Sequence, residues 1–240
     1  MIKYKGWENI IPKIKNFEFR KGITTFVNPY SMYLLKDDDF IKDIDFIHVD
    51  GFSLVKKLNS TFFSGLDRFS FDNTSLAPVV FGKVKREMLS LAIVGTTEES
   101  IHKAVENIQE IFGVSVKYFR NGYFKDDEEK IKCIDEIINL KIDVVIAGMG
   151  TPSQELFLIQ LKRHKWNGYG YTCGGYLHQI AKKSNYYPDY IDRLNLRWLY
   201  RLYDEPKLMK RYFILYPKFF LLFKRYTSGY ANIVKTNLPK

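Results

Sequence analysis

Short, almost wholly apolar runs alternate along this chain with longer segments of helical periodicity. Each run is short enough to be a buried strand, and each ends in a small or acidic residue before a helical pattern begins. The runs lie at 23–27, 46–49, 89–94 and 144–147, with a further candidate at 169–172. The alternation predicts an α/β fold, a Rossmann-like, mostly parallel sheet with helices on both faces.

Two segments have the pattern of amphipathic helices. Segment 96–112 begins with polar and acidic residues that suit a capped start. Its apolar positions are Ile101, Ala104, Val105, Ile108 and Ile111. Segment 126–140 is expected to be a surface helix, and the residues expected to face inward are Ile131, Ile134, Ile137 and Ile138. A short apolar stretch at 114–119 and an Asn-Gly turn signal lie between them, which repeats the βαβ rhythm.

The composition of the chain changes near Lys182, after which basic and aromatic residues become frequent. Between 193 and 225 basic residues outnumber acidic ones, and aromatic residues are interleaved with them. Such a segment suits a membrane interface, where rings lie at headgroup depth and cations meet anionic lipid. We therefore expect an α/β body over residues 1–182 and a C-terminal basic, helical, membrane-binding appendage over residues 183–240.

Composition narrows the class of protein further. The 240 residues are 46% hydrophobic, enough for one substantial core, and the formal charge of +10 suits lipid headgroups, nucleotide phosphates or nucleic acid. Cys133 and Cys173 form no metal or disulfide motif, so a reducing compartment is expected. No segment has the pattern of a signal peptide or a spanning helix. These features indicate a cytoplasmic protein.

Segment 142–155 is the most informative one for chemistry. Gly148 and Gly150 follow a predicted strand and allow a tight turn, and Pro152 suits the first turn of a helix. A helix start of this kind offers backbone N–H groups to a phosphate. The spacing differs from the dinucleotide-binding fingerprint, and an ordinary strand-to-helix turn is the alternative. Gln154 and Glu155, directly after the turn, favour a functional site.

Asp50 follows the apolar strand at 46–49 and precedes Gly51. Ligands of open α/β sheets bind beyond the carboxyl ends of the strands, so a carboxylate at this place is a candidate general base. The alternative is that Asp50 caps the following helix. His48, two residues earlier, suits a core or cleft position better than a metal site.

Two further segments are candidates for ligand contacts. Arg68 precedes a hydroxyl-rich turn and is suited to bind a diphosphate or carboxylate, although a surface pair with Asp67 or Asp72 is the alternative. Gly174 and Gly175 end a predicted strand, where a ligand can pass close to the backbone. The neighbouring Cys173 is expected to be a small buried hydrophobic residue rather than a nucleophile.

In their order along the chain, these segments resemble the WecG/TagA/CpsF glycosyltransferase family over nearly the whole length. The blocks that carry the resemblance are the segment around Asn28, the turn at 49–51, Arg68, the strand ending at Gly95, the stretch 148–155, Gly174 with Gly175, and the closing run 196–206 with Arg211. The stretch 148–155 and the closing run are the most specific.

The resemblance implies an inverting transfer of a sugar from a UDP-sugar to a polyprenyl-diphosphate-linked acceptor during assembly of a bacterial capsule, exopolysaccharide or teichoic acid linkage. It implies no required metal or other cofactor, and a peripheral position on the inner face of the cell membrane. The donor sugar is of the N-acetylmannosamine type or another hexose, because the chain departs from the family pattern at Phe26, Phe71 and His178. Association into a homo-oligomer stays open.

The family pattern also implies roles for single residues. Asp50 matches the catalytic base. Asn28, Arg68 and Gln154 match positions that line the active site. Together with the segments described above, the predicted donor- and substrate-binding positions are Asn28, Gly51, Arg68, Gly95, Gly148, Gly150, Pro152, Gln154, Glu155, Gly174 and Gly175. The membrane- and acceptor-binding positions are Arg193, Arg201, Lys210 and Arg211. The competing hypothesis, a non-catalytic nucleic-acid-binding protein, rests on the net charge and the basic appendage, although no nucleic-acid-binding module is recognisable in the sequence.

Overall fold

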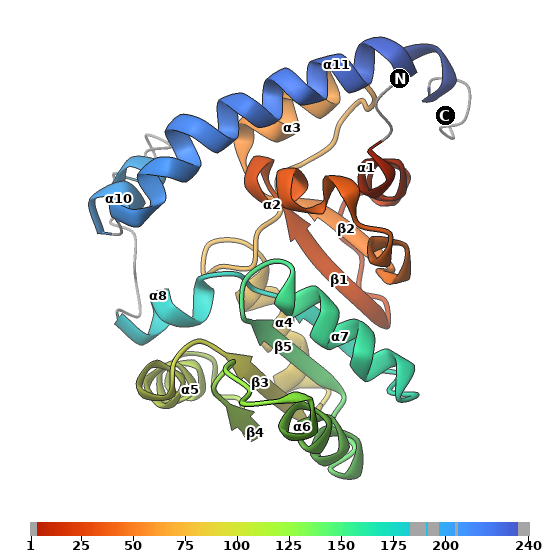
Figure 1. The fold of residues 1–240 in the computed structure, drawn as a ribbon. Coiled ribbons are helices and arrows are strands. Elements are labelled where there is room, and N and C mark those ends of the chain that lie inside the picture. The colour runs from red at the N-terminus through yellow and green to blue at the C-terminus, as the bar shows by residue number, and fades with distance from the viewer. Residues whose placement is uncertain (1–3, 183–190, 192–196, 205, 235–240) are drawn as a thin grey trace.

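A six-stranded parallel sheet in the order β2-β1-β6-β5-β3-β4 forms the centre of the molecule (Figure 1). The computed structural model describes residues 4–182, 191, 197–204 and 206–234. The strands are β1 Gly22–Val27, β2 Phe46–Val49, β3 Leu91–Gly95, β4 Val116–Arg120, β5 Val144–Gly148 and β6 Tyr169–Thr172. Every neighbouring pair is parallel, which confirms the predicted fold class.

Helices cover both faces of the sheet (Figure 1). In the body they are α1 Lys5–Ile10, α2 Pro29–Leu34, α3 Phe52–Asn59, α4 Leu76–Arg86, α5 Glu98–Phe112, α6 Asp127–Asn139, α7 Ser153–Arg163 and α8 Tyr176–Lys182. Alternate residues of β3 enter different cores. Ala92 and Val94 pack in the core that includes α6 and α7. Leu91 and Ile93 pack in the core that includes α4, α5 and α8. Because strand side chains alternate between faces, a continuous apolar strand serves both layers.

The predicted helices and strands are confirmed to within two residues at their ends. Thr97 and Asp126 cap α5 and α6 through their side chains. The prediction that Ile131 faces inward is wrong, because this residue is 38% exposed. The buried face of α6 is centred on Cys133, Ile134 and Ile137, so Ile131 falls outside it.

The last helices continue the chain beyond the sheet. They are α10 Arg197–Asp204 and α11 Tyr216–Val234, preceded by a π-helical turn at Arg211–Leu215. In α11, Phe219 and Phe223 each lie 5.4 Å, between ring centroids, from Trp7, which is fully buried. α11 therefore lies against the start of the chain, as Figure 1 shows, and shares its core. The division at residue 182 stays a prediction.

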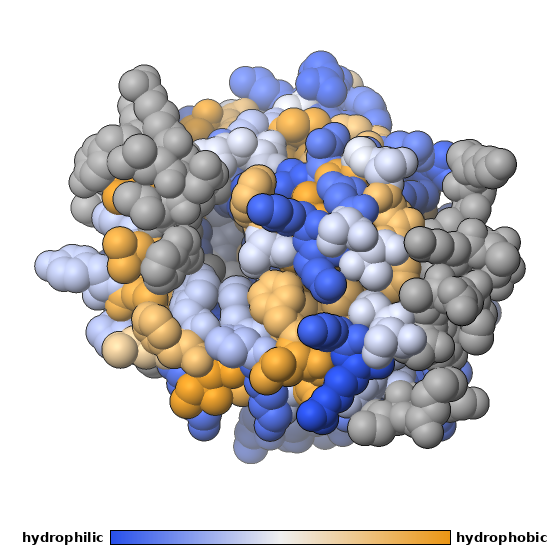
Figure 2. All heavy atoms as spheres, turned by 90° about the horizontal axis from the view of Figure 1, so that it is seen from above, coloured by the Kyte–Doolittle hydropathy of each residue, from blue (hydrophilic) through white to orange (hydrophobic). Residues whose placement is uncertain are grey.

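Helix α11 has a buried face, which carries Phe219 and Phe223, and an exposed face, which carries Leu221. Figure 2, which looks down on the side that carries α11, shows hydrophobic side chains interspersed with hydrophilic ones. Within the described part of the chain, no helix has the length and apolar character needed to cross a membrane.

Candidate active site

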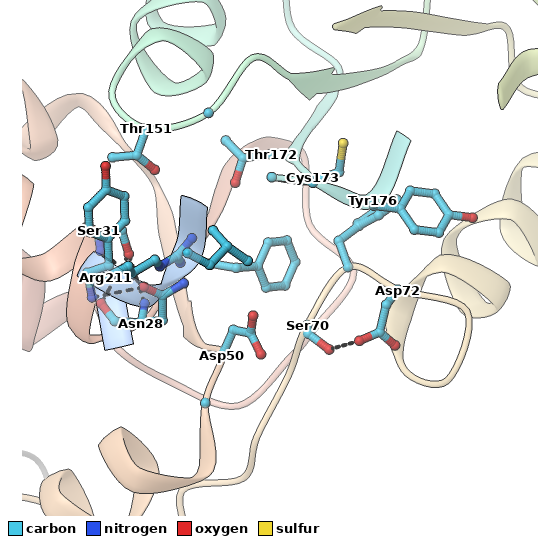
Figure 3. A pocket seen from close by; sticks show the side chains of 18 of the residues that line it. Asn28, Ser31, Asp50, Ser70, Asp72, Thr151, Thr172, Cys173, Tyr176 and Arg211 are labelled. Carbon is cyan, nitrogen blue, oxygen red and sulfur yellow. Dashed lines mark hydrogen bonds between the residues drawn. The ribbon is translucent and has the colours of Figure 1, made fainter. Parts of the chain in front are cut away.

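A cavity of about 930 Å³ lies at the carboxyl ends of β1, β2, β5 and β6. It is the place where ligands bind in open parallel sheets. Residues between Leu208 and Tyr216, from the C-terminal region, form another part of its wall. The cavity thus brings together segments that are far apart in the sequence (Figure 3).

Asp50 enters this cavity from the end of β2. Its side chain is 34% exposed, so a ligand can reach it, and its Oδ1 accepts a hydrogen bond of 2.9 Å from Arg68 Nη2. The alternative role as a helix cap is wrong, because the residue at the N-cap of α3 is Gly51 and the Asp50 side chain bonds to Arg68 instead. Gly51 has a φ of +115°, which favours glycine there.

Arg68 lies between two carboxylates. Besides Asp50, its Nη2 donates to Ser70 Oγ at 2.9 Å and lies 3.6 Å from Asp72 Oδ2. Ser70 Oγ in turn donates to Asp72, as Figure 3 shows. The alternative for Arg68 was an ion pair with Asp67 or Asp72 on the surface. The pair with Asp72 exists, but it lies in the cavity wall.

A second arginine comes from the C-terminal region. Arg211 lines the cavity, and its guanidinium carbon lies 4.4 Å above the ring of Tyr30. Such stacking orients the planar guanidinium and leaves its edge for an anion. Tyr216 lies beside it, and burial raises the pKa of this phenol.

Asn28 has a structural role at the cavity edge. Its Oδ1 accepts from the backbone N–H groups of Tyr30 and Ser31 at 3.0 and 3.1 Å, and Ser31 Oγ accepts from the Asn28 N–H. This is a complete capping box at the start of α2. The residue therefore shapes the cavity as well as lining it.

The stretch around Gln154 separates into lining and supporting residues. Gly150 and Gln154 line the cavity, as do Gly174 and Gly175. Gln154 Oε1 accepts from the Gly174 N–H at 3.1 Å, which joins the two loops. Glu155 lies behind this wall with no exposed surface, and burial raises the pKa of its carboxyl group.

Besides Glu155, three other predicted donor-binding residues, Gly95, Gly148 and Pro152, lie outside the cavity lining. A Cβ on Gly95 would meet the Gly148 carbonyl oxygen at 2.5 Å, and one on Gly148 would meet Leu177 and Cys173 at 2.7 and 2.8 Å. These glycines are explained by close packing of the chain. Pro152 is the N-cap residue of α7, one position before the expected first turn.

The predicted membrane and acceptor residues are only partly described. Lys210 is exposed and does not line the cavity, whereas Arg211 does. Arg193 and the side chain of Arg201 lie outside the described residues.

Sequence reasoning missed several lining residues. They are Tyr30, Ser31, Phe52, Ser53, Thr151, Thr172, Tyr176, Gln179, Leu208, Tyr212, Phe213 and Tyr216. Thr151 and Thr172 had a recognisable signal, since Thr151 directly follows Gly150, which was predicted to bind a ligand, and Thr172 ends the predicted strand before Gly174. Phe52 and Tyr176 likewise follow predicted glycines directly. Residues such as Gln179 and Tyr216 have no local signal, because helix packing brings them to the cavity.

His48 and Cys173 are buried, as expected. His48 Nδ1 lies 2.7 Å from the Lys15 carbonyl oxygen, its Nε2 has no partner in the described structure, and burial lowers the pKa of its imidazole. Burial raises the pKa of Cys173 to about 12, which disfavours a nucleophilic thiolate.

The fold and the site define the class of protein. A parallel α/β sheet whose carboxyl edge holds an accessible carboxylate and two arginines is suited to group transfer from an anionic substrate. The sequence model of the Glycosyl transferase WecG/TagA/CpsF family matches residues 6–232, and the chain belongs to this family. It is therefore a glycosyltransferase, which favours the enzymatic hypothesis over the nucleic-acid-binding one.

One curated relative is similar over most of its length. It is the UDP-Gal:alpha-D-GlcNAc-diphosphoundecaprenol beta-1,4-galactosyltransferase of Shigella boydii, 38% identical over 203 residues, which are 84% of this chain and 85% of the relative.

Proposed function

We propose that this glycosyltransferase transfers a hexose, with galactose as the first candidate, from a UDP-sugar to a polyprenyl-diphosphate-linked sugar in bacterial surface polysaccharide assembly. The donor and acceptor named for the relative from Shigella boydii support this substrate class. The observation that carries the proposal is the accessible Asp50 carboxylate bonded to Arg68 inside the large cavity.

Asp50 acts as the general base in this proposal. The acceptor hydroxyl oxygen attacks the anomeric carbon, its proton passes to Asp50, and the bond to the UDP oxygen breaks on the opposite face. The electron pair leaves with UDP, so the configuration at the anomeric carbon is inverted. Arg68 holds the carboxylate through Oδ1, and Oδ2 is the oxygen left to receive the proton.

Arg68 and Arg211 stabilise the leaving diphosphate. Both line the cavity, and guanidinium groups bind phosphate oxygens through paired hydrogen bonds. Their positive charge is available where negative charge develops in the transition state. We therefore expect transfer to continue in the presence of a metal chelator.

The C-terminal region brings the enzyme to its lipid-linked acceptor at the inner face of the membrane. Its exposed apolar residues are Leu199, Tyr203, Met209, Phe213, Ile214 and Leu221. Its exposed basic residues with described side chains are Lys210, Lys218, Lys224 and Arg225. Phe213 also lines the cavity, so this surface and the site are continuous. Apolar side chains beside cations favour binding to anionic lipid.

A panel of UDP-sugars with a synthetic lipid-diphosphate N-acetylglucosamine acceptor tests the substrate assignment. UDP-galactose is expected to give UDP release that depends on the acceptor. The proposal fails if no UDP-hexose in the panel supports acceptor-dependent release. Because the acceptor analogue can carry a short lipid, this assay does not depend on membrane binding.

Vesicle sedimentation tests the membrane assignment separately. The wild type is expected to bind vesicles containing phosphatidylglycerol, and Leu221→Ser with Lys224→Ser is expected to weaken that binding. Lys103→Ser on α5, which removes a charge remote from this region, serves as the matched control. Equal binding to neutral and anionic vesicles would contradict the electrostatic part of the proposal.

A further inference from the structure

Three polar side chains of one cavity wall belong to a hydrogen-bond network around a single buried carboxyl group, that of Glu155. Thr151 lies in the loop after β5, Gln154 in the first turn of α7, and Thr172 at the end of β6. All three line the cavity, and Figure 3 shows Thr151 and Thr172 on the side away from Asp50. We call these three residues the threonine wall.

Glu155 Oε1 accepts hydrogen bonds from two members of this wall. Thr151 Oγ1 and Gln154 Nε2 each donate to it at 3.1 Å. Thr25 Oγ1, on β1, donates to the same oxygen at 2.8 Å. A side chain that is fully buried therefore holds groups from β1, the β5 loop and α7 together.

Counting hydrogens sets the direction of the remaining bond. Thr25 has one hydroxyl hydrogen, and it goes to Glu155. The 2.9 Å contact between the Thr25 and Thr172 hydroxyl oxygens therefore has Thr172 as its donor. The second Gln154 amide hydrogen is directed to Thr151 Oγ1 at 3.4 Å. Every polar side-chain hydrogen of the wall is thus donated to an oxygen of the protein.

We propose that Glu155 is a positioning residue that makes the threonine wall a surface of hydrogen-bond acceptors for the hydroxyl or N–H groups of the sugar-nucleotide, and that the diphosphate binds apart from it. The oxygens of Thr151, Gln154 and Thr172 keep lone pairs for a ligand. Phosphate oxygens have no hydrogens to donate and are drawn to Arg68 and Arg211 instead. The ligand identity, though not the positioning role, rests on the proposed function.

The environment of Glu155 supports a neutral acceptor. Its Oε2 is buried and has no partner among the described residues, and a charged carboxylate is costly in such a place. Burial raises the pKa of the group, which favours the protonated form. Oε1 already accepts three hydrogen bonds, so the carboxyl hydrogen belongs on Oε2 and leaves the hydrogen count unchanged. Glutamine has the same shape and keeps Oε1 as an acceptor, so Glu155→Gln is expected to preserve the wall, whereas Glu155→Leu removes it.

The experiment compares Glu155→Gln, Glu155→Leu and, as a control, Glu110→Gln on the exposed face of α5. With UDP-galactose, Glu155→Leu is expected to lower kcat/KM by about 30-fold, mostly through KM, because buried groups lose their partner. Glu155→Gln is expected to stay within about threefold of the wild type. Inhibition by inorganic pyrophosphate is expected to be unchanged in all variants.

A structural readout separates this inference from the proposed function. Exchange of the Gly174 amide hydrogen, which donates to Gln154, is expected to accelerate in Glu155→Leu and stay slow in Glu155→Gln. Unchanged exchange in Glu155→Leu, or equal impairment by the Gln and Leu variants, would overturn the positioning role. If pyrophosphate inhibition in Glu155→Leu weakens by the same factor as kcat/KM, the acceptor assignment is overturned.

Thr25→Val covers the case in which Glu155→Leu does not fold. Valine has nearly the volume of threonine and removes one donor to Glu155 while leaving Thr151 and Gln154 in place. An intermediate loss of about fivefold in kcat/KM is expected, with faster Gly174 exchange. No change in either measurement would contradict the inference. If wild-type enzyme binds neither UDP nor pyrophosphate, the proposed donor fails, and Gly174 exchange still decides the role of Glu155.

Discussion

The Asp50 side of the cavity and the threonine wall hold their polar groups in opposite ways. On the first side the charged groups of Asp50 and Arg68 lie in the cavity, about one third exposed, and bond to each other. On the second side the ionisable group, Glu155, is fully buried, and only neutral side chains reach the cavity. In the proposed mechanism, the first side holds the charges that change during the reaction, and the second holds neutral groups that stay unchanged.

This difference follows from solvation. An exposed carboxylate keeps part of its hydration and is available to receive a proton, whereas a buried one is costly to ionise and serves better as a neutral acceptor. Each side is therefore expected to respond differently to mutation, and the two sets of responses test the comparison.

The largest effect is expected for Asp50→Asn. The amide keeps the size of the side chain but cannot take the acceptor proton, so kcat is expected to fall about 10³-fold. Thermal unfolding and UDP binding are the controls, and both are expected to stay near the wild-type values. Turnover equal to that of the wild type would remove Asp50 from the catalytic role.

Arg68→Ala is expected to have the next largest effect. It removes a charged donor from the leaving diphosphate and the partner of Asp50, so kcat/KM is expected to fall about 10²-fold. Pyrophosphate inhibition is expected to weaken as well, in contrast to the Glu155 variants. If pyrophosphate inhibits Arg68→Ala as it does the wild type, the diphosphate lies elsewhere.

Thr172→Val probes the threonine wall directly. It removes one acceptor and leaves the charges of the cavity in place, so a loss of about fivefold in kcat/KM for UDP-galactose is expected. Steady-state kinetics with varied donor measure it, and kcat is expected to change less than KM. A larger loss than that of Arg68→Ala would invert the comparison.

The smallest effect concerns stability and pH. Because the folded pKa of Glu155 is raised above its ordinary value of 4.5, the folded state holds more protons than the unfolded state, and stability falls as pH rises from 4.5 through the folded pKa. Glu155→Gln lacks this titration. The Tm of the wild type is therefore expected to fall relative to that of Glu155→Gln over this range. Parallel Tm curves would mean that Glu155 titrates normally.

Local patterns predicted much of the fold. Short apolar runs predicted the strands at 46–49 and 144–147, and the cap and period of segment 96–112 predicted α5. Ile131 was placed wrongly because a helical period gives the spacing of apolar residues but not the direction in which the neighbouring elements lie. The same limit applies to α11, whose buried face is decided by the distant Trp7.

Adjacent residues in the candidate site show the same limit. Gln154 and Glu155 were both predicted to bind the donor, but the start of α7 turns one toward the cavity and the other away from it. Gly95 and Gly148 were marked by their position at strand ends, and the structure explains them by close packing.

The sequence by itself determined the fold class, the candidate carboxylate Asp50, Arg68 and the ligand-binding edge of the sheet, because strand period, turn residues and parallel connections are local or topological properties. Only the tertiary structure decided that Arg68 bonds to Asp50, that Arg211 reaches the cavity, and that Glu155 lies behind it. These arrangements depend on contacts between residues remote in the chain, and side-chain hydrogen bonds set their directions only once those residues are packed together.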